Sequence, residues 1–509
     1  MTSRVRLIWS AVVGVVAALV TLGVAEAVAV VVAPGSSPLF AVGSFVVDIV
    51  PAWFKDFAIA LFGTGDKIAL FVGLGLLVLL LAAAVGVLEV RRRPWGSLLL
   101  LLVGLVAGTI AVTRAGANPA WAIPTAAGVV VGLLVLRAMR RRFDAWAASP
   151  NDGYDRRDFL RFGGVAAALG LLAAIGGRAI NAATTAVDIV RDAIVLPKPA
   201  TVAAPIPAGA ALDIPGISDL VTANDVFYRI DTALQVPVVD AATWRLRVTG
   251  MVEREIEIGF DELLAKPLTE ATVTLMCVSN EVGGGLVGNA TWLGWPVREL
   301  LAQAGPLPGA DMVLSRSIDG FTAGSPLEVL LEEDRDSLLA VGMNGVALPV
   351  DHGFPVRLVV PGLYGYVSAT KWVVELKVTT FADDEGYWTP RGWSAYGPVK
   401  TASRIDVPRS GAAVTAGKVA VAGVAWAQHR GIQGVEVRVD EGPWQPARLA
   451  EAISSDTWVQ WVYEWDATPG AHVLAVRATD AEGDTQSGNR VPPAPDGSEG
   501  WHTVTVNVG

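Results

Sequence analysis

The sequence contains very few residues of the kinds that form cross-links or bind haem. Its 509 residues include one cysteine, so no disulfide can form within the chain. It has four histidines, the first of which is His352, and the first 180 residues contain only two methionines, Met1 and Met139. A haem within a bilayer usually takes histidine ligands. We therefore expect no haem in this chain.

Positive charge is also scarce. Lysine and arginine total 39 against 49 acidic residues, which gives a formal net charge of −10. The second half of the chain has no basic block. Nucleic-acid binding requires a concentrated positive surface, so we expect no nucleic-acid partner.

The apolar residues, in contrast, are concentrated in the first 180 positions. A helix that crosses a bilayer needs roughly 20 apolar residues. Five runs meet or approach this length: 7–32, 67–88, 98–112, 121–136 and 162–180. A sixth stretch, 39–62, is interrupted by Asp48, Pro51, Lys55 and Asp56 and is more typical of an interfacial or re-entrant segment. The lipid bilayer is therefore an expected partner.

The arginine clusters indicate the orientation of these spans. They lie before the first span, after the second and fourth, and before the fifth, at positions 4–6, 91–93, 137–142 and 156–161. Arginine-rich loops usually remain in the cytoplasm. Five spans with a cytoplasmic N-terminus place every cluster inside. We therefore expect a multi-pass protein of the cytoplasmic membrane, with everything after about residue 185 outside the cytoplasm.

The segment DRRDFLRFGG (155–164) resembles the twin-arginine export signal, in which paired arginines precede an apolar stretch. That route carries folded domains, as a protein that acquires a cofactor in the cytoplasm would need. The alternative is a basic flank that stops transfer.

The remainder of the chain predicts a multi-domain protein. Residues 1–184 form the membrane domain, and 185–215, rich in proline and alanine, form a linker. Residues 216–405 mix strand-like runs with short helices, which predicts an α+β domain. Residues 406–509 contain short alternating runs separated by turns, which predicts an all-β sandwich rich in tryptophan.

The lone thiol, Cys277, follows the strand-like run TVTLMC and precedes a glycine-rich loop. Three interpretations are open. A lone cysteine is most commonly a small buried hydrophobe. A nucleophile would need a neighbouring base, and a thiolate is a good ligand for soft metals.

A second segment, LPVDHGFPVRLVVPGLYGYVSATKW, favours the last interpretation. It places His352, Arg357 and Lys371 among glycines and hydroxyl side chains. Such residues in loops can bind a phosphate attached to a polar ring system.

Several separated motifs resemble those of the sulfite-oxidase superfamily, which includes periplasmic methionine-sulfoxide reductases. They are NDVFYRID, CVSN with TWLGWPVREL, RSIDGF, MNGVALPVDHGFPVRLVVPG and GYVSATKW, in that order between residues 224 and 372. The similarity extends from about residue 222 to 509. It implies a sulfite-oxidase-type molybdopterin domain followed by an immunoglobulin-like dimerisation domain, and thus a possible homodimer.

The resemblance implies roles for the matching positions only. Cys277 would bind molybdenum, with Arg229 close to the metal. The residues implied to contact the pterin are Asn224, Phe227, Tyr228, Ser317, His352, Arg357, Ser368, Thr370 and Lys371. The implied cofactor is molybdenum–molybdopterin, and the implied reaction is two-electron oxygen-atom transfer on a small molecule.

One departure bears on the substrate. Sulfite oxidases place arginines just after the cysteine, whereas this chain has VSNEV, and we expect Glu281 to repel sulfite near the site. We therefore expect reduction of a sulfoxide or N-oxide, with electrons from a quinone, a cytochrome or a membrane redox protein. The alternatives are a sulfite dehydrogenase and, from another class, a membrane-anchored binding or scaffold protein without cofactor.

Overall fold

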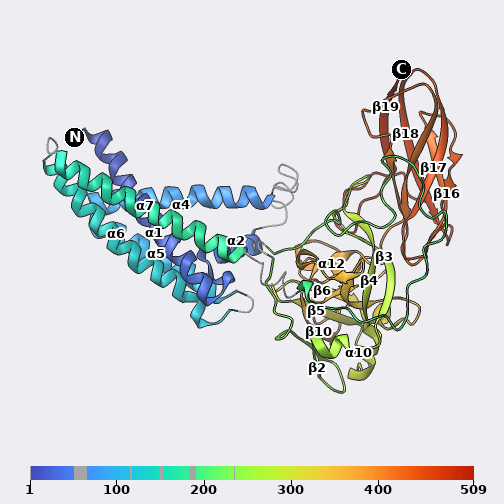
Figure 1. The fold of residues 1–509 in the computed structure, drawn as a ribbon, viewed down its shortest axis with the longest axis horizontal. Coiled ribbons are helices and arrows are strands. Elements are labelled where there is room, and N and C mark those ends of the chain that lie inside the picture. The colour runs from blue at the N-terminus through green and yellow to red at the C-terminus, as the bar shows by residue number, and fades with distance from the viewer. Residues whose placement is uncertain (1, 51–65, 115–116, 150–152, 183–190, 234–235) are drawn as a thin grey trace. The chain divides into compact units, whose positions relative to one another are not determined.

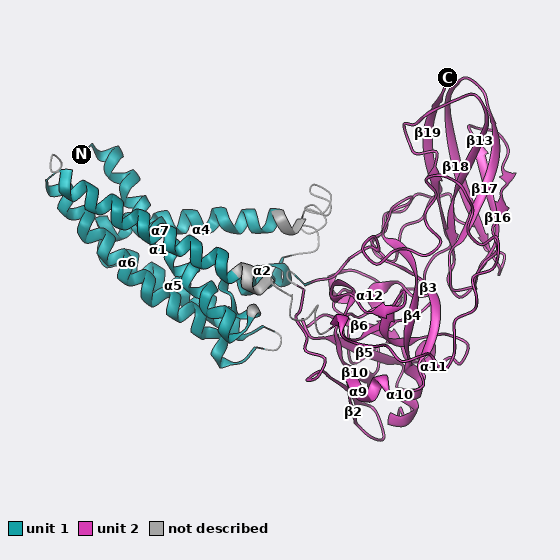
Figure 2. Ribbon diagram, viewed as in Figure 1, with its two compact units in different colours: residues 1–186, 233–235 teal, residues 187–232, 236–509 magenta. Residues whose placement is uncertain are grey.

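The computed structural model describes residues 2–50, 66–114, 117–149, 153–182, 191–233 and 236–509. The chain divides into two compact units (Figures 1 and 2), and each is described separately. Unit 1 comprises residues 1–186 and 233–235, and unit 2 comprises residues 187–232 and 236–509.

Unit 1 is helical. Its α-helices are α1 (Ser3–Val32), α2 (Pro38–Ile49), α4 (Asp66–Arg91), α5 (Trp95–Val112), α6 (Ile123–Ala148) and α7 (Gly153–Ala182), joined by the short 3-10 helices η1 (Pro34–Ser36) and η3 (Pro119–Ala122). Five segments are long and apolar enough to cross a membrane: Ser3–Val32, Ala69–Arg91, Trp95–Val112, Pro119–Ala148 and Gly153–Gly177. Each overlaps one of the five predicted runs, with ends that differ by up to 12 residues.

The interrupted stretch 39–62 is only partly described. Its first part forms α2, whose 12 residues rise about 18 Å, too little to cross about 30 Å of hydrocarbon. Residues 51–62 lie outside the described part of the chain. The twin-arginine-like segment 155–164 lies within α7 and is helical.

Helix α1 packs against α4, α6 and α7. Glycine allows close contact, because a Cβ atom on Gly14 would overlap the backbone of Ala82 and Gly86 in α4. At another level the bundle is filled by an aromatic cluster, in which the rings of Trp9, Trp146 and Phe159 lie 5.4–5.7 Å apart.

Two carboxyl groups are buried in this bundle, and both accept hydrogen bonds from serine. Glu89 of α4 accepts from the backbone nitrogen of Ser97 at 2.8 Å and from its hydroxyl at 3.0 Å, at the start of α5. Glu26 of α1 accepts from the hydroxyl of Ser37 at 2.6 Å, next to the first turn of α2. Glu26 thus has a polar partner although it lies in an apolar run.

The first part of unit 2 contains two sheets and several short helices. One sheet has the order β2-β1-β10-β5-β6, and the other has the order β3-β4-β7-β8, with β9 also paired to β7. The strands are β1 (Arg245–Gly250), β2 (Ile256–Gly259), β3 (Thr269–Met276), β4 (Val287–Pro296), β5 (Met312–Ser317), β6 (Thr322–Pro326), β7 (Leu338–Met343), β8 (Val346–Ala347), β9 (Arg357–Val359) and β10 (Val373–Thr379). The helices are α9 (Phe260–Leu264), α10 (Val297–Ala304), α11 (Leu327–Leu331), α12 (Gly365–Ser368), η4 (Val350–His352) and η5 (Thr389–Arg391).

Residue pattern explains which strands lie inside. β1 alternates between exposed arginines and the buried Leu246 and Val248, as expected for a strand with one solvated face. β7 is buried at every position and is apolar throughout.

The last part of unit 2 is a β-sandwich. Its two sheets have the orders β11-β13-β17-β16 and β12-β19-β18-β14-β15. The strands are β11 (Ala402–Val407), β12 (Ala413–Val414), β13 (Gly417–Trp426), β14 (Ile432–Val439), β15 (Gln445–Pro446), β16 (Arg448–Leu449), β17 (Val459–Ala467), β18 (Gly470–Asp480) and β19 (His502–Val508). Its core is built around the fully buried Trp461. The predicted fold class, apolar helices followed by an α+β part and an all-β sandwich, is confirmed.

The proline-rich segment before the α+β part belongs to unit 2 and is hydrogen-bonded to the rest of it. Residues 200–201 and 203 hydrogen-bond to Leu268 and Glu270 at the start of β3. Further along, Leu212 donates its backbone N–H to the side chain of Gln460 in β17 at 2.6 Å. The segment thus contacts both the α+β part and the sandwich.

Candidate active site

Cys277 follows the last residue of β3 and is buried. Consecutive residues of a strand point to opposite faces. The preceding residue, Met276, lines one hollow of unit 2, whereas Cys277 lines another. We call the hollow that contains Cys277 the thiol cavity.

Five segments from distant parts of the chain meet at the thiol cavity: 227–232, 277–279, 317–321, 352–372 and 388–393. It encloses about 900 Å³ of empty space, counting its opening to solvent. Seven of the eleven predicted site residues line it, namely Phe227, Tyr228, Cys277, Ser317, His352, Arg357 and Lys371. The structure thus brings together residues up to 144 positions apart in the sequence.

Backbone hydrogen bonds fix the loop that carries the thiol. Cys277 donates its N–H to the carbonyl of Leu286 at 2.9 Å, and the side chain of Asn280 accepts from the N–H of Leu286 at 2.8 Å. Burial raises the pKa of the Cys277 thiol, and hydrogen bonds from Ser279 and the charge of Lys371 oppose this shift. A thiolate here therefore needs a cationic partner.

Arg357, the first residue of β9, has an unusual environment. Its side chain donates only to backbone carbonyls, those of His352, Leu358 and Ala369, at 3.2–3.4 Å, and it lies 5.0 Å from the ring centroid of Trp292. Among the described residues, no carboxylate forms an ion pair with it. Burial lowers the pKa of Arg357 to about 10. A buried guanidinium without a carboxylate partner in the described part of the chain has the chemistry to bind an anionic group of a ligand.

Lys371 belongs to a buried ion-pair network. Its Nζ atom lies 2.7 Å from Asp231, which also accepts from Arg229 at 2.9 Å. Arg229 pairs in addition with Asp351 at 2.9 Å. Burial lowers the pKa of Lys371 to about 8, and Asp231 limits this shift. For Arg229, burial acts against the charge, but the two aspartates raise its pKa above the ordinary value.

His352 holds the first loop in place. Its Nε2 atom lies 2.8 Å from the carbonyl oxygen of Asn224, and its ring stands edge-on to Phe227. Burial lowers the pKa of His352 to about 4, so the ring is neutral at pH 7 and donates this hydrogen bond. Asn224 is itself held by Asn344, which donates to its side-chain oxygen at 2.8 Å.

Four predicted residues do not line the thiol cavity: Asn224, Arg229, Ser368 and Thr370. The hydroxyl of Ser368 donates to the carbonyl of Tyr364 at 2.9 Å, within the short helix α12. The hydroxyl of Thr370 lies 2.7 Å from that of Ser315 in β5. Both hydroxyls are thus hydrogen-bonded within the fold, and they fix the loop that carries Lys371.

The thiol cavity also contains residues that we had not predicted. Two carboxylates, Asp231 and Asp319, line it, and so do the aromatic side chains of Phe321, Trp388 and Trp393. Asp231 lies within the NDVFYRID motif, and Asp319 and Phe321 lie within RSIDGF, so those motifs could have indicated them. The two tryptophans lie in GYWTPRGW, beyond the last motif considered.

Glu281 is not where we expected it. It does not line the thiol cavity but the other hollow, together with Met276. The loop turns there at Gly283, which has a φ of +79° and packs against the ring of His502 in the sandwich. The expectation that Glu281 repels a substrate beside the thiol is therefore wrong.

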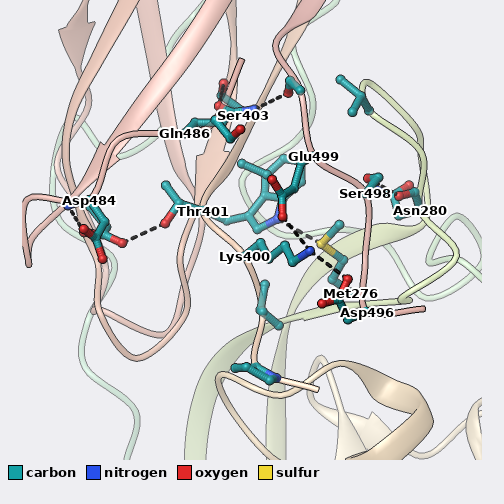
Figure 3. Close-up of a pocket in the computed structure, with 18 of the residues that line it drawn as sticks. Met276, Asn280, Lys400, Thr401, Ser403, Asp484, Gln486, Asp496, Ser498 and Glu499 are labelled. Atoms are coloured by element: carbon teal, nitrogen blue, oxygen red, sulfur yellow. Dashed lines mark hydrogen bonds and ion pairs between the residues drawn. The ribbon is translucent and has the colours of Figure 1, made fainter. Parts of the chain in front are cut away.

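The hollow behind the thiol loop, which we call the rear cleft, encloses about 1360 Å³ of empty space, again counting its opening to solvent. It lies between residues 280–283 of this loop, the connection 394–403, and the turns 480–487 and 496–500 of the sandwich. Figure 3 shows Lys400 extending between Glu499 and Asp496, at 2.8 and 3.0 Å. At its floor, the indole nitrogen of Trp426 donates to the sulfur of Met276 at 3.0 Å.

A family model and several known proteins match this chain. Residues 233–388 match the family model described as the oxidoreductase molybdopterin binding domain. The chain is 30% identical over 319 residues to the sulfite oxidase of Gallus gallus, covering 53% of this chain and 69% of that protein. It is 32% identical over 271 residues to the mitochondrial sulfite oxidase of Mus musculus, covering 45% of this chain and 49% of that protein.

The chain therefore spans about half the length of the mitochondrial relatives that it matches. Among solved structures, the sulfane dehydrogenase SoxCD from Paracoccus pantotrophus is 24% identical with a TM-score of 0.49, covering 58% of this chain and 84% of that chain. The match to the avian enzyme spans more than two thirds of that enzyme's length. The chain belongs to the sulfite oxidase family and carries its molybdopterin-binding oxidoreductase domain.

Proposed function

We propose that this protein is a membrane-anchored molybdopterin-dependent oxidoreductase that reduces a small organic sulfoxide or N-oxide outside the cytoplasm. The observation that carries the proposal is the buried Arg357, which has no carboxylate partner among the described residues and lines the same cavity as the only thiol. A thiolate and a buried guanidinium in one cavity together suit a metal held by a phosphorylated pterin.

In this proposal Cys277 is the protein ligand to molybdenum. Arg357 and Lys371 would hold the pterin phosphate, and Phe227 and Tyr228 would contact the ring system. The bound cofactor supplies the two-electron oxygen-atom transfer. The chain keeps the thiol buried, orients His352 as a neutral donor and encloses the site.

The remaining predicted residues act through their neighbours. Asn224, Ser368 and Thr370 fix the two loops, because their side chains hydrogen-bond within the protein. Arg229 reaches the site through Asp231, to which Lys371 is also bonded. Ser317 differs from these residues, because it lines the cavity and would contact the cofactor directly.

The proposed substrate follows from the charged groups and the aromatic side chains that line the thiol cavity. The cavity has two cations, Arg357 and Lys371, and two carboxylates, Asp231 and Asp319. If both cations serve the pterin, no cation remains for sulfite, whereas the aromatic side chains of Trp388 and Trp393 suit an uncharged organic oxide. The second candidate is sulfite oxidation, and the names of the relatives favour it.

The five apolar helices support the membrane anchor, and the arginine clusters support a cytoplasmic N-terminus with the site outside. Electrons would come from a quinone, a cytochrome or another membrane redox protein, and the sandwich could pair two copies. Accessibility of an engineered cysteine at the exposed Val195 to an impermeant reagent tests the orientation.

Metal analysis and turnover of the purified full-length chain test the function. We expect about one molybdenum per chain and faster reduction of methyl sulfoxides by a reduced viologen than oxidation of sulfite by ferricyanide. Cys277→Ser should lose both activities and the molybdenum electron paramagnetic resonance signal while its thermal unfolding is retained. Absence of molybdenum would leave the scaffold interpretation, and preference for sulfite would establish the second candidate.

A further inference from the structure

Electrons for the proposed reduction must reach the thiol cavity from another molecule. Reduction of a sulfoxide consumes two electrons and two protons (R₂SO + 2e⁻ + 2H⁺ → R₂S + H₂O). A one-electron carrier must therefore dock twice per turnover, at a surface within reach of Cys277.

The rear cleft has the geometry of such a surface. Met276 lines the cleft and Cys277 lines the thiol cavity, so one peptide bond separates the two. The sulfur of Met276 in turn contacts Trp426, a second residue of the cleft, at 3.0 Å. A short path of bonded and contacting atoms therefore leads from the thiol to the cleft floor.

The charge of the cleft indicates what kind of partner it fits. Five carboxylates line it against two cations, Lys400 and Arg430. Both cations are already paired: Lys400 with Asp496 and Glu499, and Arg430 with Asp480 at 3.0 Å. The remaining carboxylates, Glu281 and Asp484, are exposed, and among the described residues neither forms an ion pair.

The position of the rear cleft beside Cys277 and the charge of its lining thus favour the same kind of partner. We propose that the rear cleft is the docking site of a basic one-electron carrier protein, which delivers electrons to the site through Trp426, Met276 and Cys277. This inference rests on the proposed function, which is the reaction that consumes the electrons. The docking itself can be measured without turnover. Opposite charges on the two proteins also speed their encounter and make it sensitive to salt.

The test uses the full-length chain in detergent, with cytochrome c as a basic probe protein and its lysine-acetylated form as the charge control. We expect binding to weaken steeply with added salt, and acetylation to abolish it. Changing Glu281→Gln and Asp484→Asn together should weaken binding about tenfold. The matched control neutralises two exposed acids elsewhere on the sandwich, Glu441→Gln and Glu451→Gln, and should bind like the parent.

The electron path is tested by Trp426→Phe, which keeps an aromatic ring but removes the indole N–H that donates to the sulfur of Met276. Dithionite-reduced chain is mixed with oxidised cytochrome c, and the rate of haem reduction is followed. We expect electron transfer to be at least about threefold slower at a cytochrome c concentration that saturates the binding of both the parent and the variant.

Equal binding by the Glu281/Asp484 variant and the parent would overturn the docking site. An unchanged rate in the Trp426 variant would overturn the path. If the chain binds the probe but contains no molybdenum, the proposed function fails and the docking site stands.

Discussion

The buried guanidinium of Arg357 provides the sharpest prediction. Burial lowers its pKa to about 10 from the ordinary 12.5, so keeping it charged in the folded protein costs about 3 kcal/mol at 1.36 kcal/mol per pKa unit. The folded pKa is the lower one, so this cost is fully present at every pH below about 10, including pH 7. Its three hydrogen bonds to backbone carbonyls each stabilise the folded protein by roughly 1 kcal/mol.

These contributions nearly offset one another in the chain without cofactor. Arg357→Met should therefore change the free energy of unfolding of the empty chain by no more than about 1 kcal/mol. In the loaded chain, the same substitution removes a charged partner from a buried anion, which costs about 2 kcal/mol or more. Cofactor affinity should then fall at least about 30-fold.

The assay compares thermal unfolding of the loaded and empty forms and measures molybdenum retained after dialysis. Arg357→Lys should retain part of the affinity, since a lysine keeps the charge but not the two-pronged geometry. Arg247→Met, at an exposed arginine of β1, is the matched control and should retain the metal. Equal losses in the loaded and empty forms, or full metal retention by Arg357→Met, would refute the assignment of Arg357 to the anion.

Three further predictions concern other parts of unit 2. Trp461→Ala should destabilise the sandwich by about 3–5 kcal/mol in a denaturant titration, whereas Trp461→Phe should cost much less, because the indole nitrogen has no hydrogen-bond partner among the described residues. Burial lowers the pKa of His502, so stability should decrease as the pH falls below about 6.5, and His502→Asn should flatten that dependence in thermal melts. Gly288→Val should displace Phe227, since a Cβ atom on Gly288 would lie 2.8 Å from its ring, and molybdenum content should fall without unfolding.

Short motifs in the sequence were sufficient to predict seven residues that line the thiol cavity, whereas their roles toward a cofactor stay a prediction. Cys277, His352, Arg357 and Lys371 line one cavity although no periodic pattern relates them. The helices of unit 1 were predictable for a simpler reason, since a long apolar run has few other stable conformations.

The pairings between motifs could not be predicted in the same way. Lys371 bonds to Asp231, 140 residues earlier, and this contact depends on how two loops are folded. Glu281 was misplaced for a related reason. It is four residues after Cys277, but the turn at Gly283 directs the loop toward His502, so proximity in sequence did not become proximity to the thiol.

The register of β3 decides which sulfur atom faces which hollow. β3 pairs with β4 so that Met276 lies opposite Val287, and Thr274 donates its hydroxyl to the side chain of Asn289 at 2.9 Å. A shift of one residue would exchange the two faces of the strand, placing the thioether in the cavity and the thiol in the rear cleft. Asn289 prevents this shift, because it also donates to the carbonyl of Leu220 at 2.8 Å. The position of the proposed metal ligand thus depends on a buried hydrogen-bond network beyond the cavity itself.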